Sequence, residues 1–153
     1  KNQRNIFKIL VNSSDRILIE DEPVTDLTGL RDQVKEFVLN FGNVDEESMA
    51  LYNSLPGSLK ALAKQSDTSS DNPTEAVISF KADRGTSYDI YIGILDELQG
   101  AYYEIYGDRV GLTADEFRAL DIKKPDDMEL YSKARDGFPM NISIAEPTKI
   151  GGN

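Results

Sequence analysis

The feature that most constrains the fold is an apolar run that turns sharply into a long amphipathic helix between residues 76 and 107. Residues 76–82 are rich in β-branched and aromatic side chains and predict a strand. The adjacent apolar pair Val77 and Ile78 indicates a strand that is buried on both faces. After a tight corner at residues 83–85, apolar side chains recur at helical spacing and predict one buried helix face: Tyr91, Ile94, Leu95, Leu98, Ala101, Tyr102 and Ile105.

Local signals mark both ends of this helix. Thr86, followed three residues later by Asp89, resembles a capping box, and Gly107 is expected to end the helix. Of the neighbouring tyrosines, Tyr103 and Tyr106 are either interface residues or half-exposed ones.

A β-hairpin and a second amphipathic helix precede this unit. Two apolar runs, residues 6–11 and 17–19, flank a turn-forming segment and predict the hairpin, with Pro23 ending its second strand or lying in the loop that follows. Asp26 is the expected N-cap of the helix and Gly42 its expected C′ residue. Its apolar stripe comprises Leu27, Leu30, Val34, Phe37, Val38 and Phe41.

Two stretches are less regular and are interpreted as insertions. Residues 43–74 are polar and turn-rich, support one or two short helical turns, and are expected to be mobile between about 65 and 74. In residues 108–137, a capping box at 113–116 predicts a short helix, and a second helix is expected from about 126 to 135.

The chain closes on alternating apolar residues at 140, 142 and 144, which predict a half-buried strand, and residues 146–153 are expected to form a flexible tail. These segments predict one domain spanning residues 1–153. Its class is α+β, with a small mixed sheet, two main helices on one face, and helical or loop insertions.

Composition excludes several classes of function. The net charge of −10 disfavours binding to nucleic acid or to an anionic membrane surface. The chain contains no Cys and no His, so it forms no disulfide and none of the usual zinc sites. Nothing in these 153 residues approaches the ~18 consecutive apolar residues of a transmembrane helix. No cofactor or metal motif is present.

Carboxylates are the only abundant side-chain groups in this chain that could take part in catalysis. A glycoside hydrolase needs two carboxylates held ~5–10 Å apart, a distance that sequence does not measure. The acidic runs at 45–47 and 126–127 are better interpreted as solvated helix starts. An anion site at the turn of residues 83–86 is less favoured than ordinary helix capping. We therefore predict a domain that is not an enzyme and acts through protein contacts. A small-ligand-binding domain, or a carboxylate-dependent hydrolase, is the alternative.

Two blocks of the sequence carry a family resemblance. The first leads from the hairpin into the first helix, residues 9–27, and the second is Phe-Lys-Ala-Asp-Arg-Gly-Thr-Ser-Tyr at 80–88, continuing to Leu-Asp-Glu-Leu at 95–98. Together they resemble the periplasmic domain of the ExbD/TolR family of biopolymer-transport proteins and cover roughly half of the chain. The closing strand also occupies the expected final position.

The resemblance implies the element order β-β-α-β-α-β and a homodimer. It also implies a membrane anchor upstream of Lys1, in the inner membrane of a Gram-negative cell, with this domain in the periplasm. An ExbB/TolQ-like channel subunit and a TonB/TolA-like protein would be its partners, and the family's proton-carrying Asp would lie in the anchor. The function implied is the coupling of proton-motive force to TonB-dependent transport.

Four residues are the candidate partner contacts. Glu22 and Pro23 lie at the end of a predicted strand, and Asp83 and Tyr88 lie at the entrance of the long helix. Contact could also involve addition of an edge strand to a partner. Turn geometry and helix capping are the competing explanation for the same residues.

Overall fold

The computed structural model describes residues 2–145. The predicted tail at 146–153 lies outside the described residues. The elements follow in the order η1 (Gln3–Asn5), β1 (Ile6–Val11), β2 (Ile17–Ile19), β3 (Glu22–Val24), α1 (Leu30–Val38), α2 (Glu46–Ser54), α3 (Gly57–Leu62), β4 (Val77–Ala82), α4 (Tyr88–Arg109), α5 (Ala114–Arg118), α6 (Pro125–Arg135) and β5 (Ile142–Ala145). Within this part of the chain, no helix combines the length and apolar character needed to cross a bilayer.

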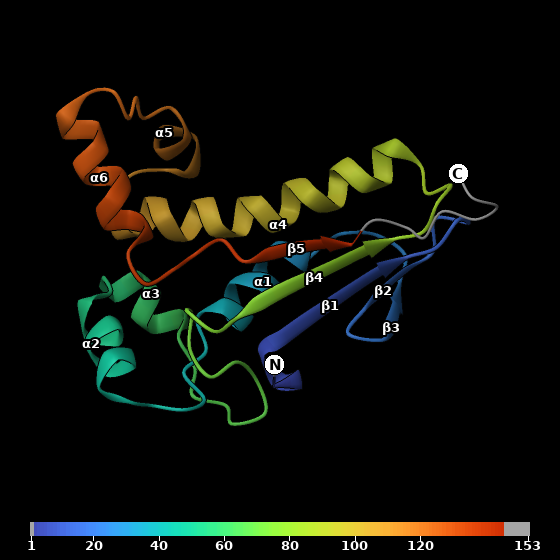
Figure 1. Ribbon diagram of the computed structural model, residues 1–153, viewed down its shortest axis with the longest axis horizontal. Coiled ribbons are helices and arrows are strands. Elements are labelled where there is room, and N and C mark those ends of the chain that lie inside the picture. The colour runs from blue at the N-terminus through green and yellow to red at the C-terminus, as the bar shows by residue number, and fades with distance from the viewer. Residues whose placement is uncertain (1, 146–153) are drawn as a thin grey trace.

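One five-stranded mixed sheet, in the order β3-β2-β1-β4-β5, organises the domain (Figure 1). The β1–β2 and β2–β3 pairs are antiparallel, whereas β1–β4 and β4–β5 are parallel. The predicted α+β class and the predicted hairpin are confirmed. The short strand β3 is an addition, and its Pro23 lies on the sheet edge, where a missing backbone N–H breaks no ladder.

Helices α1 and α4 pack on one face of the sheet. Phe37 of α1 lies against Phe7 of β1, with ring centroids 5.4 Å apart. On the same face Ile78 is fully buried, but Val77, on the opposite face, is only half-buried. The prediction that β4 is buried on both faces is therefore wrong, because no helix among residues 2–145 covers the second face, which is turned to the viewer in Figure 1.

Both predicted ends of the first helix are wrong. The α1 helix begins at Leu30, after Gly29 in a left-handed conformation (φ 83°), and the Asp26 carboxylate instead accepts a hydrogen bond from the Thr28 N–H (3.0 Å). The helix ends at Val38. Gly42 lies beyond it, where the backbone passes so closely that a Cβ would come within 2.5 Å of the Ser66 carbonyl oxygen.

The ends of α4 also differ from the prediction. Its N-cap is Ser87, whose hydroxyl accepts a hydrogen bond from the Ile90 N–H (3.3 Å). The helix passes through Gly107 to Arg109 and ends with Gly111 in the left-handed conformation (φ 75°). The Leu112 N–H then donates to the Gly107 carbonyl (2.9 Å), which is the Schellman arrangement. Gly107 is required for close packing, since a Cβ there would lie 2.5 Å from the Leu112 carbonyl oxygen.

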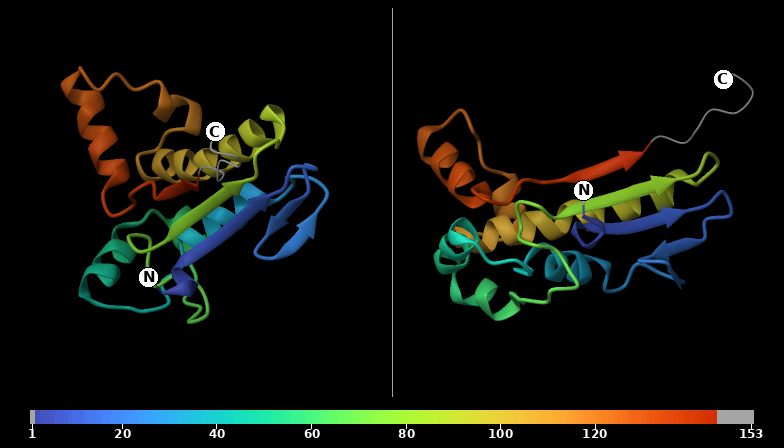
Figure 2. Two further views of the ribbon diagram at one scale, coloured as in Figure 1. Left: turned by 45° about the vertical axis from the view of Figure 1, so that its right-hand side comes forward. Right: turned by 60° about the horizontal axis from the view of Figure 1, so that its bottom comes forward.

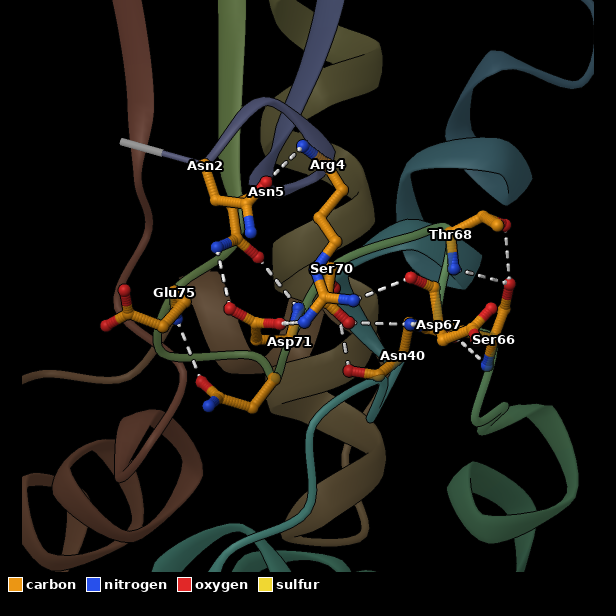
Figure 3. Close-up of polar contacts among 11 residues, drawn as sticks. Asn2, Arg4, Asn5, Asn40, Ser66, Asp67, Thr68, Ser70, Asp71 and Glu75 are labelled. Atoms are coloured by element: carbon orange, nitrogen blue, oxygen red, sulfur yellow. Dashed lines mark hydrogen bonds and ion pairs between the residues drawn. The ribbon is translucent and has the colours of Figure 1, made fainter.

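The loop that was expected to be mobile, residues 65–74, is tied to the rest of the domain (Figure 3). The buried Asn40 side chain donates to the Ser66 and Ser70 carbonyls at 2.8 and 2.6 Å. Asp71 accepts from Asn5 (2.9 Å) and forms an ion pair with Arg4. The polar composition that suggested mobility instead supplies these long-range hydrogen bonds, which a local sequence reading does not detect.

The two stretches interpreted as insertions carry the short helices. Helices α2 and α3 lie within residues 43–74, and α5 and α6 within 108–137. The capping box at the start of α5 is confirmed by both of its hydrogen bonds, Thr113 N–H to Glu116 (2.9 Å) and Glu116 N–H to Thr113 (3.1 Å). Helices α5 and α6 gather at the carboxyl end of α4, away from the turns that follow β1 and β4 (Figure 2).

Candidate contact site at the carboxyl end of the sheet

The parallel strands β1 and β4 end at the same edge of the sheet, with Val11 opposite Ala82. The turns that follow are joined by hydrogen bonds. The Asp83 N–H donates to the Val11 carbonyl (2.8 Å), and the Ser87 N–H donates to the Asp15 carboxylate (2.8 Å). Asp15 reaches this position with a positive φ of 59°. The start of α4 is thus held by the turn of the hairpin.

Ser87, not Thr86, caps α4 because it directly precedes the first helical residue, Tyr88. The Thr86 hydroxyl donates to the Asn12 carbonyl across the two turns (3.3 Å), whereas Ser87 has an extended backbone, as N-cap residues do. Gly85, with φ 95°, supplies the left-handed residue that the corner requires. The first residue of the helix, Tyr88, is left 75% exposed.

A shallow hollow of about 340 Å³ lies between this turn and the last strand. Its large apolar lining residues are Tyr88, Tyr91 and Ile144. Tyr91 stacks on Phe80 of β4, with ring centroids 5.3 Å apart. Ile144 belongs to β5 and is 40% exposed, although its in-register partner Phe80 is fully buried. The apolar face of the sheet is therefore incompletely covered at the end of β5.

Strand β5 is also an edge of the sheet. It pairs with β4 on one side only within the part of the chain that the structure describes. An edge strand presents unpaired backbone N–H and C=O groups to which an extended segment of another chain can add. The hollow and the open edge thus adjoin each other and offer apolar contact together with backbone hydrogen bonding.

The four predicted contact residues do not form one surface. Asp83 and Tyr88 both line the hollow. Glu22 and Pro23 are exposed in β3, on the opposite edge of the sheet, with β2 and β1 between them and β4. Three strand spacings correspond to about 14 Å, so the two pairs belong to separate surfaces.

Sequence reasoning missed Ile144 as a contact residue. The alternation at residues 140–144 indicated a half-buried strand, but alternation does not reveal which strand becomes the sheet edge. The sequence also predicted that Tyr106 is an interface residue or half-exposed. It is instead fully buried and donates a hydrogen bond to the Phe138 carbonyl (2.6 Å).

A larger hollow, about 640 Å³, lies elsewhere, between α2, the loop of residues 71–75 and the end of α6. Two of its acidic residues have structural roles. Asp45 caps α2 by accepting the Ser48 N–H (2.8 Å), which lowers the pKa of that carboxyl, and Asp71 pairs with Arg4. Among residues 2–145, no group of three or more His, Cys, Asp or Glu side chains is arranged to hold a metal ion.

The other shifted carboxyl group joins α1 to α4. Glu104 accepts hydrogen bonds from Arg31 (2.8 Å) and Lys35 (3.0 Å), and Arg31 also pairs with Glu97 (3.0 Å). Burial by itself raises the pKa of Glu104, but the two cations outweigh it and hold that pKa below 4.5. This ion cluster holds two helices together. Its carboxylates are paired with cations, and the lowered pKa of Glu104 does not suit a general acid, which needs a raised pKa.

Comparison of the chain with family models, curated proteins and solved structures gives no match.

Proposed function

We propose that this chain is a protein-binding domain without enzymatic activity, and that it serves as the periplasmic part of an ExbD/TolR-like energy-transducing subunit. In that role it would couple proton-motive force to TonB-dependent transport, anchored in the inner membrane of a Gram-negative cell. The ExbB/TolQ-like and TonB/TolA-like partners, and the homodimer, belong to the same proposal. The observation that carries the binding role is the exposed Tyr88 beside the open edge of β5.

Two further observations support the proposal. The elements β1, β2, α1, β4, α4 and β5 follow one another in the order that the resemblance implies, with η1, β3, α2, α3, α5 and α6 added. The resembling blocks also converge in space, because the turn of the hairpin and the turn before α4 are joined by hydrogen bonds. The block at residues 80–88 also contributes Asp83 and Tyr88 to the hollow beside β5.

Contact at this hollow is tested with variants of exposed side chains in the full-length protein, purified from cells after cross-linking. Tyr88→Ala removes the exposed ring, and Ile144→Lys places a charge at the edge of β5. Val44→Lys is the matched control, since Val44 is 44% exposed and lies outside the hollow. We expect Tyr88→Ala and Ile144→Lys to lose cross-linked partners that the wild type and Val44→Lys retain. Unchanged cross-links in both folded variants would contradict the binding role.

The membrane setting is tested separately, by determining the cellular sequence upstream of Lys1. About twenty apolar residues interrupted by one Asp would support an anchored, proton-coupled subunit. A start Met immediately before Lys1, or a cleavable signal peptide, would contradict the anchored role and leave only a binding domain.

A further inference from the structure

A second hollow, of about 430 Å³, lies at the opposite end of α4, where that helix meets α5 and α6. Four aromatic side chains form it. Phe117 stacks almost parallel on Tyr131, with centroids 5.6 Å apart and planes at 9°, and also contacts Tyr106 (5.3 Å) and Tyr103 (6.2 Å). Phe117 and Tyr106 are buried, whereas Tyr103 and Tyr131 are half-buried, so the hollow is lined by both buried and partly exposed rings. Leu120 and Met140 complete the apolar lining.

Two exposed arginines line the same hollow. The Arg118 guanidinium lies over the Tyr103 ring (4.9 Å), and the Arg135 guanidinium lies over the Tyr131 ring (5.1 Å). Neither forms an ion pair with a carboxylate among residues 2–145, in a chain that has 27 acidic and 17 basic residues. Arg135 also lies over the Tyr106 ring (6.0 Å) and hydrogen-bonds that side chain. A guanidinium has five N–H donors, so one that rests on an aromatic ring can still donate to an incoming carboxylate.

The aromatic lining and the two arginines together indicate which kind of ligand the hollow binds. Apolar rings bury a large side chain, and two guanidinium groups beside them favour carboxylates next to that side chain. We infer that the hollow between α4, α5 and α6 binds an acidic peptide segment of another protein, with one large apolar side chain against Phe117 and flanking carboxylates on Arg118 and Arg135. This inference stands independently of the proposed function, because it concerns a different surface.

The inference is tested by NMR titration of the ¹⁵N-labelled chain with the peptide acetyl-Gly-Asp-Phe-Glu-Gly-amide. Two control peptides separate the contributions, one with Asn and Gln in place of the acids and one with Ala in place of Phe. N-acetylphenylalanine tests for a small-molecule site. We expect saturable shifts around residues 103, 117 and 131 below about 1 mM peptide, with affinity at least about tenfold weaker for each control peptide and for N-acetylphenylalanine.

Arginine variants locate the contact. Arg118→Gln combined with Arg135→Gln removes both charges, and Arg16→Gln is the matched control, since Arg16 is exposed on the hairpin and forms no ion pair within residues 2–145. Binding should weaken at least about tenfold in the double variant and stay unchanged in Arg16→Gln. Dispersed spectra of both variants verify their fold.

Three outcomes would overturn the inference. These are the absence of saturable shifts at the hollow, equal binding of the uncharged peptide, and equal binding of N-acetylphenylalanine, the last of which would indicate a small-molecule pocket.

Discussion

The two ends of α4, about 33 Å apart along a helix of 22 residues, are held in different ways. At the carboxyl end, stacked aromatic rings and a Schellman turn join α4 to α5 and α6. At the amino end, hydrogen bonds between two turns position the helix, and Tyr88 is left exposed. We therefore expect the buried rings at the carboxyl end to contribute more to the stability of the domain than the exposed Tyr88 at the amino end.

Phe117→Ala is the most severe test of this difference. The ring is 3% exposed and contacts three other aromatic residues, so its removal leaves a cavity and is expected to cost about 3–5 kcal/mol of the free energy of unfolding. Urea denaturation followed by circular dichroism measures the effect. A loss below about 1 kcal/mol would mean that α5 and α6 contribute little to the stability of the domain.

Gly107→Ala tests the close packing at the same end with a single methyl group. The new Cβ would meet backbone atoms that have little room to move, and we expect a loss of about 1–3 kcal/mol. Gly57→Ala is the matched control, because Gly57 is also helical and has nothing within 4 Å of an added Cβ. Hydrogen exchange should show lost protection in α5 and α6 for Gly107→Ala only. Equal stability of the two variants would contradict the close-packing role of Gly107.

The ion cluster in the middle of α4 should have a smaller, pH-dependent effect. The folded protein holds the pKa of Glu104 below its usual 4.5, so the unfolded chain takes up this proton first as the pH falls. The stabilisation by Arg31 and Lys35 is therefore complete well above pH 4.5 and is lost below it. Glu104→Gln should be destabilised by about 1 kcal/mol or less at pH 7, because the cluster is partly exposed.

Unfolding measured between pH 7 and pH 3 checks the sign of this effect. The difference between wild type and Glu104→Gln should shrink as the pH falls. A difference that grows at low pH would contradict the pairing of Glu104 with the two cations.

Tyr88→Ala should have the smallest effect on stability, less than about 0.5 kcal/mol, because the ring is mostly exposed. The same urea denaturation that measures Phe117→Ala provides the comparison. A loss of more than about 1 kcal/mol would show that Tyr88 supports the fold, and it would remove the distinction between the two ends.

Prediction from sequence succeeded for the hairpin strands and for one helix cap, but not for the ends of α1 and α4. The strands β1 and β2 were predicted with their observed bounds, and the capping box of α5 was predicted from four residues, since alternation and capping are read from neighbouring side chains. Prediction failed where a neighbour decided the outcome. Gly107 looked like a helix end, but its role depends on the carbonyl of Leu112, which packs against the helix only in the folded chain.

The candidate site was only half predictable for the same reason. Asp83 and Tyr88 were identified because a strand-to-helix turn has a local signature, and both line the hollow. Glu22 and Pro23 were identified by the same kind of signal, yet the strand order places them on the other edge of the sheet. Ile144 was recognised only as part of a strand, because its exposure depends on β5 being an edge strand that α4 leaves uncovered.

Apolar periodicity and composition are properties of the chain, so they were sufficient to predict the α+β class, the succession of the main elements and the acidic charge. The folded chain was needed to show which strand is an edge, which hydrogen bonds hold residues 65–74, and that Tyr103, Phe117 and Tyr131 share one hollow. Those outcomes arise from contacts between residues far apart in the chain, whose free energies depend on packing in three dimensions and have no counterpart in local sequence.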